Sequence, residues 1–331
     1  MTNASEWLAM TEEEPIEPDL PIIDPHHHLW DRPTTSYVLN DIVDDASGHN
    51  VRQTVFIECS WAYRDDGPEE MKVIGETDYC EGVAAQSAGQ GGPDICAGII
   101  GAADLTLGDA VAPVLEAHRA ASPGHFRGIR HRAAWDASDE VMGPRAKPPG
   151  DLLMQPAFRE GFAHLAANEM TFEAWLFHPQ IPQLEDLAKA FPETTMIVNH
   201  LAGPLGIGPY RLDEVFDGWK DGITALASYP NLVMKVGGIQ MPVNGFGWHE
   251  RERPPTSDEL LEQNRRWYLH AIDAFGPERC MFESNFPVDR ASCSYTVVWN
   301  QFKKLSADFT ESERAAMLHD TAARVYRLDA K

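Results

Sequence analysis

Short apolar or β-branched runs alternate with helical stretches along almost the whole chain, and this alternation constrains the fold more than any other feature. The expected strands are Leu20–Asp24, Thr54–Cys59, Ile95–Ala102, His125–His131, Thr171–Phe177, Thr195–Asn199, Leu232–Val236 and Cys280–Asn285. The expected helices are Pro68–Gln86, Asp109–Ala121, Pro156–Glu169, Gln180–Phe191, Leu212–Tyr229, Ser257–Phe275, Ala291–Leu305 and Glu311–Tyr326. Strands that alternate with helices pair in parallel through right-handed crossovers. Eight such strands, with no Gly-x-Gly-x-x-Gly fingerprint after the first, favour a closed (β/α)8 TIM barrel over an open dinucleotide-binding sheet.

The length of 331 residues is ordinary for one barrel with long loops at its carboxyl-terminal face. Residues 1–19 are expected to form an acidic N-terminal extension, and residues 20–331 the barrel domain. No basic and apolar leader opens the chain, and no stretch of about 18 apolar residues occurs that would span a bilayer.

The charge balance limits the partners of the chain. Asp and Glu outnumber Lys and Arg by 51 to 27, which gives a net charge of −24. Such a surface repels nucleic acid and anionic lipid, so a small-molecule substrate is expected, and an anionic one would need local positive charge. The five scattered cysteines indicate a reducing compartment, so the chain is expected in the cytoplasm. A homodimer is compatible with the sequence, which does not fix the oligomeric state.

Histidines gather where the predicted strands end, which is where TIM barrels carry their chemistry. His26 and His28 follow the first strand, His178 the fifth and His200 the sixth. Residues i and i+2 of a strand point to the same side, so His26 and His28 face the barrel interior together. With His200 they form a candidate site for a divalent metal, typically Zn²⁺. The alternative for any single histidine is a structural role.

Positive charge at the same mouth is expected from Arg130 and His131, which follow the fourth strand. Arg130 is suited to hold a substrate carboxylate at two points, although it could instead bridge loop acids. Glu58, at the end of the second strand, is a further metal ligand, an orienting partner of a histidine or a rim residue.

Three aromatic residues are candidates for the pocket wall. Trp61 and Tyr63 follow the second strand, and Trp248 lies in the long loop Gly237–Pro255. Loops of that length are often functional lids, so Trp248 is a candidate to close over substrate. Packing inside the protein or against another subunit is the alternative for all three.

Several of these segments together resemble a known family. IIDPHHHLWD is similar to the first-strand signature of the amidohydrolase superfamily, and FRGIRHRAAWD, FEAWLFHPQIPQLEDLAKAFPETTMIVNHLAGP and MFESNFPVDR resemble its amidohydrolase-related branch, which includes sugar and pyrone lactonases. The resemblance runs from about Asp24 to Leu328. It implies that His26 and His28 are metal ligands, or polar anchors where metal is dispensed with. It also implies that His200 is the strand-six histidine and that His178 points at the substrate carbonyl or the attacking water.

The last strand departs from the pattern of that branch, Gly-Ser-Asp-Trp-Pro. Here the segment reads Glu283-Ser284-Asn285-Phe286-Pro287, and an amide cannot accept a proton as a carboxylate does. Glu283 and Asn285 share one face of the strand, so Glu283 could return a carboxylate to nearly the same place. Glu283 is therefore the expected base, Asn285 the group that holds the water or an oxyanion, and Asp289 the rival base. A buried structural pair with a cation is the alternative for Glu283.

These residues predict a hydrolase that opens a lactone, or a related ester or amide, of a small substrate that could carry a carboxylate. Metal, or a carboxylate without metal, would activate the water. Two other functions stay open: non-oxidative decarboxylation of an aromatic or related acid on the same fold, and a barrel that binds a ligand without catalysis. Asn285 argues against the decarboxylase, because the resemblance implies an acidic group there as proton donor.

Overall fold

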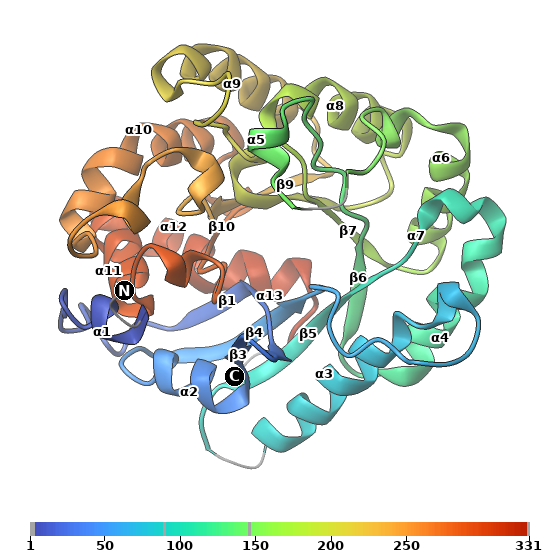
Figure 1. The fold of residues 1–331 in the computed structure, drawn as a ribbon, viewed down its shortest axis with the longest axis horizontal. Coiled ribbons are helices and arrows are strands. Elements are labelled where there is room, and N and C mark those ends of the chain that lie inside the picture. Colours follow the sequence, from blue (N-terminus) through green and yellow to red (C-terminus); the bar gives the residue numbers. More distant parts are fainter. Residues whose placement is uncertain (1–3, 89–90, 145–146, 330–331) are drawn as a thin grey trace.

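The structure, a computed structural model, describes residues 4–88, 91–144 and 147–329. Eight parallel strands form one sheet in the order β1-β4-β5-β6-β7-β8-β9-β10 (Figure 1). Their bounds are Ile22–His27 (β1), Val51–Ile57 (β4), Asp94–Ala102 (β5), Phe126–Arg130 (β6), Thr171–Ala174 (β7), Met196–Val198 (β8), Leu232–Gly237 (β9) and Cys280–Glu283 (β10). All eight predicted strands are confirmed. A hairpin of β2 (Trp30–Arg32) and β3 (Thr35–Tyr37) was not predicted.

The sheet closes on itself where the last strand meets the first. His27 forms a parallel bridge with Phe286. The His28 amide donates to the Phe286 carbonyl at 2.8 Å, and the Asn285 amide donates to the His26 carbonyl at 3.0 Å. These contacts join β1 to the end of β10, so the predicted TIM barrel is confirmed.

Helices pack against this barrel, most of them around its outside (Figure 1). They are α1 (Ala4–Leu8), α2 (Leu39–Ala46), α3 (Ile74–Ser87), α4 (Ala112–Ala121), α5 (Asp139–Met142), α6 (Pro156–Phe162), α7 (His164–Ala167), α8 (Ile181–Ala190), α9 (Leu212–Ala227), α10 (Ser257–Phe275), α11 (Tyr295–Ser306), α12 (Glu311–Ala315) and α13 (Thr321–Val325). Thr310 caps α12 reciprocally with Glu313, as Ser/Thr-x-x-Glu spacing predicts. Among the described residues, no helix offers an apolar stretch long enough to cross a bilayer.

Alternate strand residues point into the barrel, so inward-facing residues two apart along a strand fill successive layers of its interior. The apolar layer includes Ile197, Val233 and Met281, and Tyr326, just after α13, packs against it. Two residues further along three of these strands, at Asn199, Lys235 and Glu283, the buried side chains are polar. The chain thus places a polar layer directly above an apolar floor, on the side where the strands end.

The N-terminal extension lies against α10 and α11. The Lys303 ammonium donates to the Ile16 carbonyl at 2.7 Å, and Asn300 Oδ1 accepts from the Ile16 amide at 2.9 Å. Glu13 Oε1 accepts from the Ser257 amide at 2.7 Å. These contacts tie the extension to the barrel wall.

Candidate active site

A buried carboxylate lies between two histidines at the carboxyl end of the barrel. Glu283 Oε1 is 2.7 Å from Nδ1 of His200 and accepts from the His200 amide at 3.2 Å. Its Oε2 is 2.8 Å from Nδ1 of His26. His26 comes from β1, Glu283 from β10, and His200 follows β8, so three distant segments converge. The side chain of Glu283 is fully buried.

The backbone around His200 is unusual and fixes the direction of its ring. His200, Leu201 and Ala202 all have positive φ, which side chains rarely adopt. The Trp219 indole donates to the Leu201 carbonyl at 2.7 Å and holds this turn. Gly238 leaves the space for the ring, because a Cβ there would lie 1.9 Å from His200 Nδ1.

Nδ1 of His26 has two close neighbours of opposite charge. Besides Glu283, the Lys235 ammonium lies 3.1 Å away, and Lys235 also pairs with Glu173 at 2.8 Å. The contact between Lys235 and His26 Nδ1 has the geometry of a hydrogen bond, whereas the contact between Glu283 and His26 Nδ1 does not. We therefore assign His26 Nδ1 as the acceptor of a hydrogen bond from the Lys235 ammonium. Among the described residues, His26 Nε2 and Glu283 Oε2 then lack a hydrogen-bond partner although both are buried.

These two orphaned atoms fit a site for a cation. One donor atom from each of His26, His200 and Glu283 lies within 4.8 Å of the others, and imidazole nitrogen with carboxylate oxygen is a donor set typical of Zn²⁺. Burial, and then the charge of Lys235, lowers the pKa of His26 well below 6.5, which keeps the ring in the neutral form that binds metal.

His28 lies beside this cluster and not within it. Its ring centre is 5.0 Å from that of His26, and its Nδ1 contacts the Ile57 carbonyl at 2.8 Å. A proton on Nδ1 leaves Nε2 as an acceptor. Burial, and then Arg130, lowers the pKa of His28 well below 6.5. Of the three predicted metal ligands, the structure therefore brings together His26 and His200, and it adds Glu283 in place of His28.

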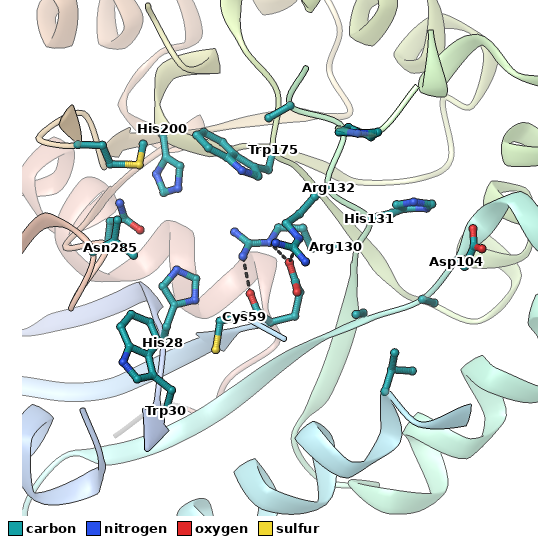
Figure 2. A pocket seen from close by; sticks show the side chains of 18 of the residues that line it. His28, Trp30, Cys59, Asp104, Arg130, His131, Arg132, Trp175, His200 and Asn285 are labelled. Carbon is teal, nitrogen blue, oxygen red and sulfur yellow. Dashed lines mark hydrogen bonds and ion pairs between the residues drawn. The ribbon is translucent and has the colours of Figure 1, made fainter. Parts of the chain in front are cut away.

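A cavity of about 610 Å³ opens above the cluster. It is lined by His28, Trp30, Arg32, Glu58, Cys59, Tyr63, Val73, Ala102, Ala103, Asp104, Arg130, His131, Arg132, Ala134, Met142, Lys147, Pro148, Trp175, Phe177, His200, Met241, Asn285 and Val288. Figure 2 shows His28, His200 and Asn285 around the same space, with Arg130 and Arg132 facing them. Glu283, the expected base, does not line the cavity, but its Oε1 contacts His200, which does.

The rival base, Asp289, is buried and occupied. Its Oδ1 accepts from Nδ2 of Asn285 at 2.9 Å, and its Oδ2 accepts from the Gln240 amide at 3.2 Å. Burial raises the pKa of Asp289 well above 3.8. Asp289 does not line the cavity. Because it binds Nδ2 of Asn285, the amide oxygen of Asn285 is left facing the cavity (Figure 2).

Arg130 reaches the cavity but is engaged by Glu58. Its Nε lies 2.8 Å from Glu58 Oε1, and a second nitrogen donates to the Glu58 carbonyl oxygen. Both side chains are nearly fully buried. We therefore correct the prediction that Arg130 holds a substrate carboxylate. The Arg130 guanidinium group is already bound to Glu58, and pairing with an acid was the alternative that the sequence left open.

The other predicted residues divide between the cavity and its surroundings. Tyr63 and His131 line the cavity, and His131 Nδ1 accepts from the Leu105 amide at 3.1 Å. Trp61 is absent from the wall. Trp248 is only 2% exposed and packs in the hydrophobic core, so a lid closed by its ring is corrected to a structural role.

His178 also lies outside the cavity wall. Its Nδ1 accepts from the Leu205 amide at 3.3 Å, and its ring packs edge-on against Tyr210. The role implied by the resemblance is not supported by this placement. A residue that follows a strand reaches the mouth only if its side chain also turns inward, and that direction could not be read from the sequence.

The sequence reasoning missed two exposed arginines at the mouth, Arg32 and Arg132, and the ring of Trp175 beside His200. Trp175 is one residue past β7 and three before His178. Arg132 directly follows the predicted strand that contains Arg130. The sequence shows only that these residues follow predicted strands. This places them near the mouth of the barrel but does not say which individual side chains line it.

An eight-stranded parallel barrel with histidines and a buried carboxylate at its carboxyl end defines a TIM-barrel enzyme with a candidate metal centre. Residues 23–328 match the sequence model of the amidohydrolase family, so the chain belongs to that family. It is 32% identical to the protein y4mH of Sinorhizobium fredii over 94% of this chain and 99% of that one. It is also 28% identical to an L-fucono-1,5-lactonase of Burkholderia multivorans over 61% of this chain and 63% of that enzyme.

The fold likeness extends to solved structures. An amidohydrolase from Burkholderia multivorans, crystallised with bound zinc, superposes with a TM-score of 0.71 at 23% identity, covering 93% of this chain and 99% of that one. At this identity the likeness shows the shared fold.

Proposed function

We propose that the protein is a hydrolase that opens the lactone ring of a small molecule. The observation that carries the proposal is the His200–Glu283 pair at the cavity wall. Nδ1 of His200 faces the Glu283 carboxylate, so the proton of a neutral ring is held there and Nε2 is left as an acceptor. The similarity to an L-fucono-1,5-lactonase supports a lactone as the substrate.

The residues provide each part of the reaction. His200 Nε2 accepts a proton from water as the water oxygen adds to the lactone carbonyl, and Glu283 stabilises the imidazolium that forms. The amide oxygen of Asn285 accepts a hydrogen bond from the other O–H group of that water and so orients the water. The ring C–O bond then breaks, and His200 returns its proton to the departing alkoxide oxygen. The product is the open-chain hydroxy acid.

A divalent metal held by His26, His200 and Glu283 is the alternative way to activate the water: it would lower the pKa of a bound water to about 7 and polarise the carbonyl, and His200, as its ligand, would then not be the proton acceptor. We propose zinc, because the donors are nitrogens and a carboxylate oxygen. Glu283 matters with or without the metal, either as a ligand or as the orienting partner of His200.

The test is a pH-stat screen of five- and six-membered lactones with the wild-type protein, Glu283→Gln and a control, His164→Asn. His164 lies on α7 and pairs with Asp109, and neither residue lines the cavity. We expect acid release at constant pH, lost by about a hundredfold or more in Glu283→Gln and kept in His164→Asn. Turnover of Glu283→Gln near that of the wild type would overturn the mechanism. Release of carbon dioxide from an aromatic acid, with no lactone opened, would favour the decarboxylase.

A further inference from the structure

Two arginines at the cavity mouth are fixed to one short loop. Arg32 ends the β2 strand, and its Nη2 donates to the Cys59 carbonyl at 2.7 Å. Arg132 follows β6, and its Nη2 donates to Ser60 Oγ at 2.6 Å. Because Cys59 and Ser60 are consecutive, both guanidinium groups are held beside the same turn of the chain. Both side chains line the cavity.

The charge of these arginines is only weakly balanced. Glu58 Oε1 lies 2.8 Å from Arg130 but 3.5 Å from Arg132, whose side chain is 54% exposed. Arg32 has no ion pair with a carboxylate of the described residues, and its guanidinium stacks over Trp30 at 5.1 Å. Each guanidinium carries five donors, and one or two of them are used in each case.

The remaining acids do not cancel this positive charge. Among the described residues, Asp104 is the other acid on the cavity wall, and its Oδ1 accepts from the amide and hydroxyl of Thr106. Lys147, a further cation on the wall, pairs with Asp139. The chain as a whole has a net charge of −24, whereas the cavity mouth carries weakly paired guanidinium groups. The charge at the mouth is therefore opposite in sign to that of the protein as a whole. Such a reversal attracts anions to one place on an otherwise repelling protein.

We infer that Arg32 and Arg132 form a carboxylate-binding subsite and that the substrate is a lactone bearing a carboxylate in addition to its ring ester. The inference rests on the proposed function for the ring ester and on the two arginines for the carboxylate. The planar guanidinium fork suits two-point binding of a carboxylate. Arg130, buried against Glu58, supports the mouth and does not take part in this contact.

The test separates carboxylate recognition from catalysis by using ligands that have no scissile ester. Tetrahydropyran-2-carboxylate and tetrahydropyran-2-carboxamide share one ring and differ in charge, and each is titrated into the protein by calorimetry. We expect the wild type to bind the carboxylate at least about tenfold more tightly than the amide, as charge-assisted hydrogen bonds imply. The preference should disappear in Arg32→Gln/Arg132→Gln and return in part in Arg32→Lys/Arg132→Lys, which keeps the charge without the fork.

The control is Arg265→Gln, which removes an exposed arginine from α10, where it faces Asp308 at 3.6 Å. That variant should keep the wild-type preference. Equal affinity of the wild type for the two ligands would overturn the inference, as would an unchanged preference in the double glutamine variant. If the carboxylate is preferred but no lactone is opened, the subsite stands and the proposed reaction fails.

Discussion

Gly238 offers a way to move His200 without changing any group that carries the proposed chemistry. It follows β9 and has a φ of +65°, a backbone conformation that disfavours a side chain. A Cβ at this position would lie 1.9 Å from Nδ1 and 2.6 Å from Cγ of His200. Gly238→Ala is therefore a steric perturbation aimed at a single ring.

The size of the effect follows from these distances. Contacts of a Cβ below 3.0 Å essentially never occur in proteins, so the ring or the backbone must shift by about 1 Å. The His200–Glu283 contact of 2.7 Å is then lost or badly aligned. A misplacement of about 1 Å in a catalytic group can cost about a hundredfold in rate. The left-handed backbone adds about 1 kcal/mol of instability for alanine.

The assay compares kcat/KM for a lactone that the wild type opens, together with urea unfolding of each variant. Gly67→Ala is the matched control, because Gly67 has a φ of +90° and a Cβ there would meet no atom within 4 Å beyond its own chain neighbours. It carries the backbone cost without the steric clash. We expect Gly238→Ala to lose about a hundredfold in kcat/KM while staying folded, and Gly67→Ala to keep wild-type activity. Activity of Gly238→Ala within about threefold of the control would refute the role given to His200.

Two further predictions concern the buried charges. Lys235→Met should lower the free energy of unfolding by about 3–5 kcal/mol, because Glu173 is left buried without its cation. Lys235→Met/Glu173→Gln should recover most of that loss in urea unfolding, and a single variant as stable as the wild type would contradict the pairing. Burial and the nearby Glu58 raise the pKa of Glu76 above 4.5, so the folded protein keeps a proton that the unfolded chain loses. The stability from Glu76 is therefore complete below about pH 4.5 and declines as the pH rises. Urea unfolding at pH 5 and pH 8 should show wild type losing stability relative to Glu76→Gln, and a constant difference would argue against the shifted pKa.

The barrel was predictable because its strands are buried on both sides and read as continuous apolar runs. Leu232–Val236 illustrates this, since the structure extends that strand by a single residue. The hairpin β2–β3 was missed because three-residue strands are too short to show an alternating pattern. The helix Leu39–Ala46 was missed as well, although its buried residues recur at the three- and four-residue spacing that is typical of a helix with one buried face.

The site was predictable in its position and less so in its contacts. Two-residue alternation placed Glu283 and His26 toward the interior, and the structure has their side chains 2.8 Å apart. Glu58 and Arg130 were both expected at the mouth, yet their pairing depends on the separation of β4 and β6, which the sequence does not contain. The left-handed turn at His200 has no local signal either, because no glycine stands there.

Zinc binding tests the central claim, that His26, His200 and Glu283 converge as one cluster at the barrel mouth. Metal-free wild type, His200→Asn and His178→Asn would each be titrated with zinc by calorimetry, with the bound metal counted by elemental analysis. We predict about one zinc per chain for the wild type and for His178→Asn, and a large loss of affinity in His200→Asn. Equal zinc binding by all three proteins, or a loss confined to His178→Asn, would contradict the cluster.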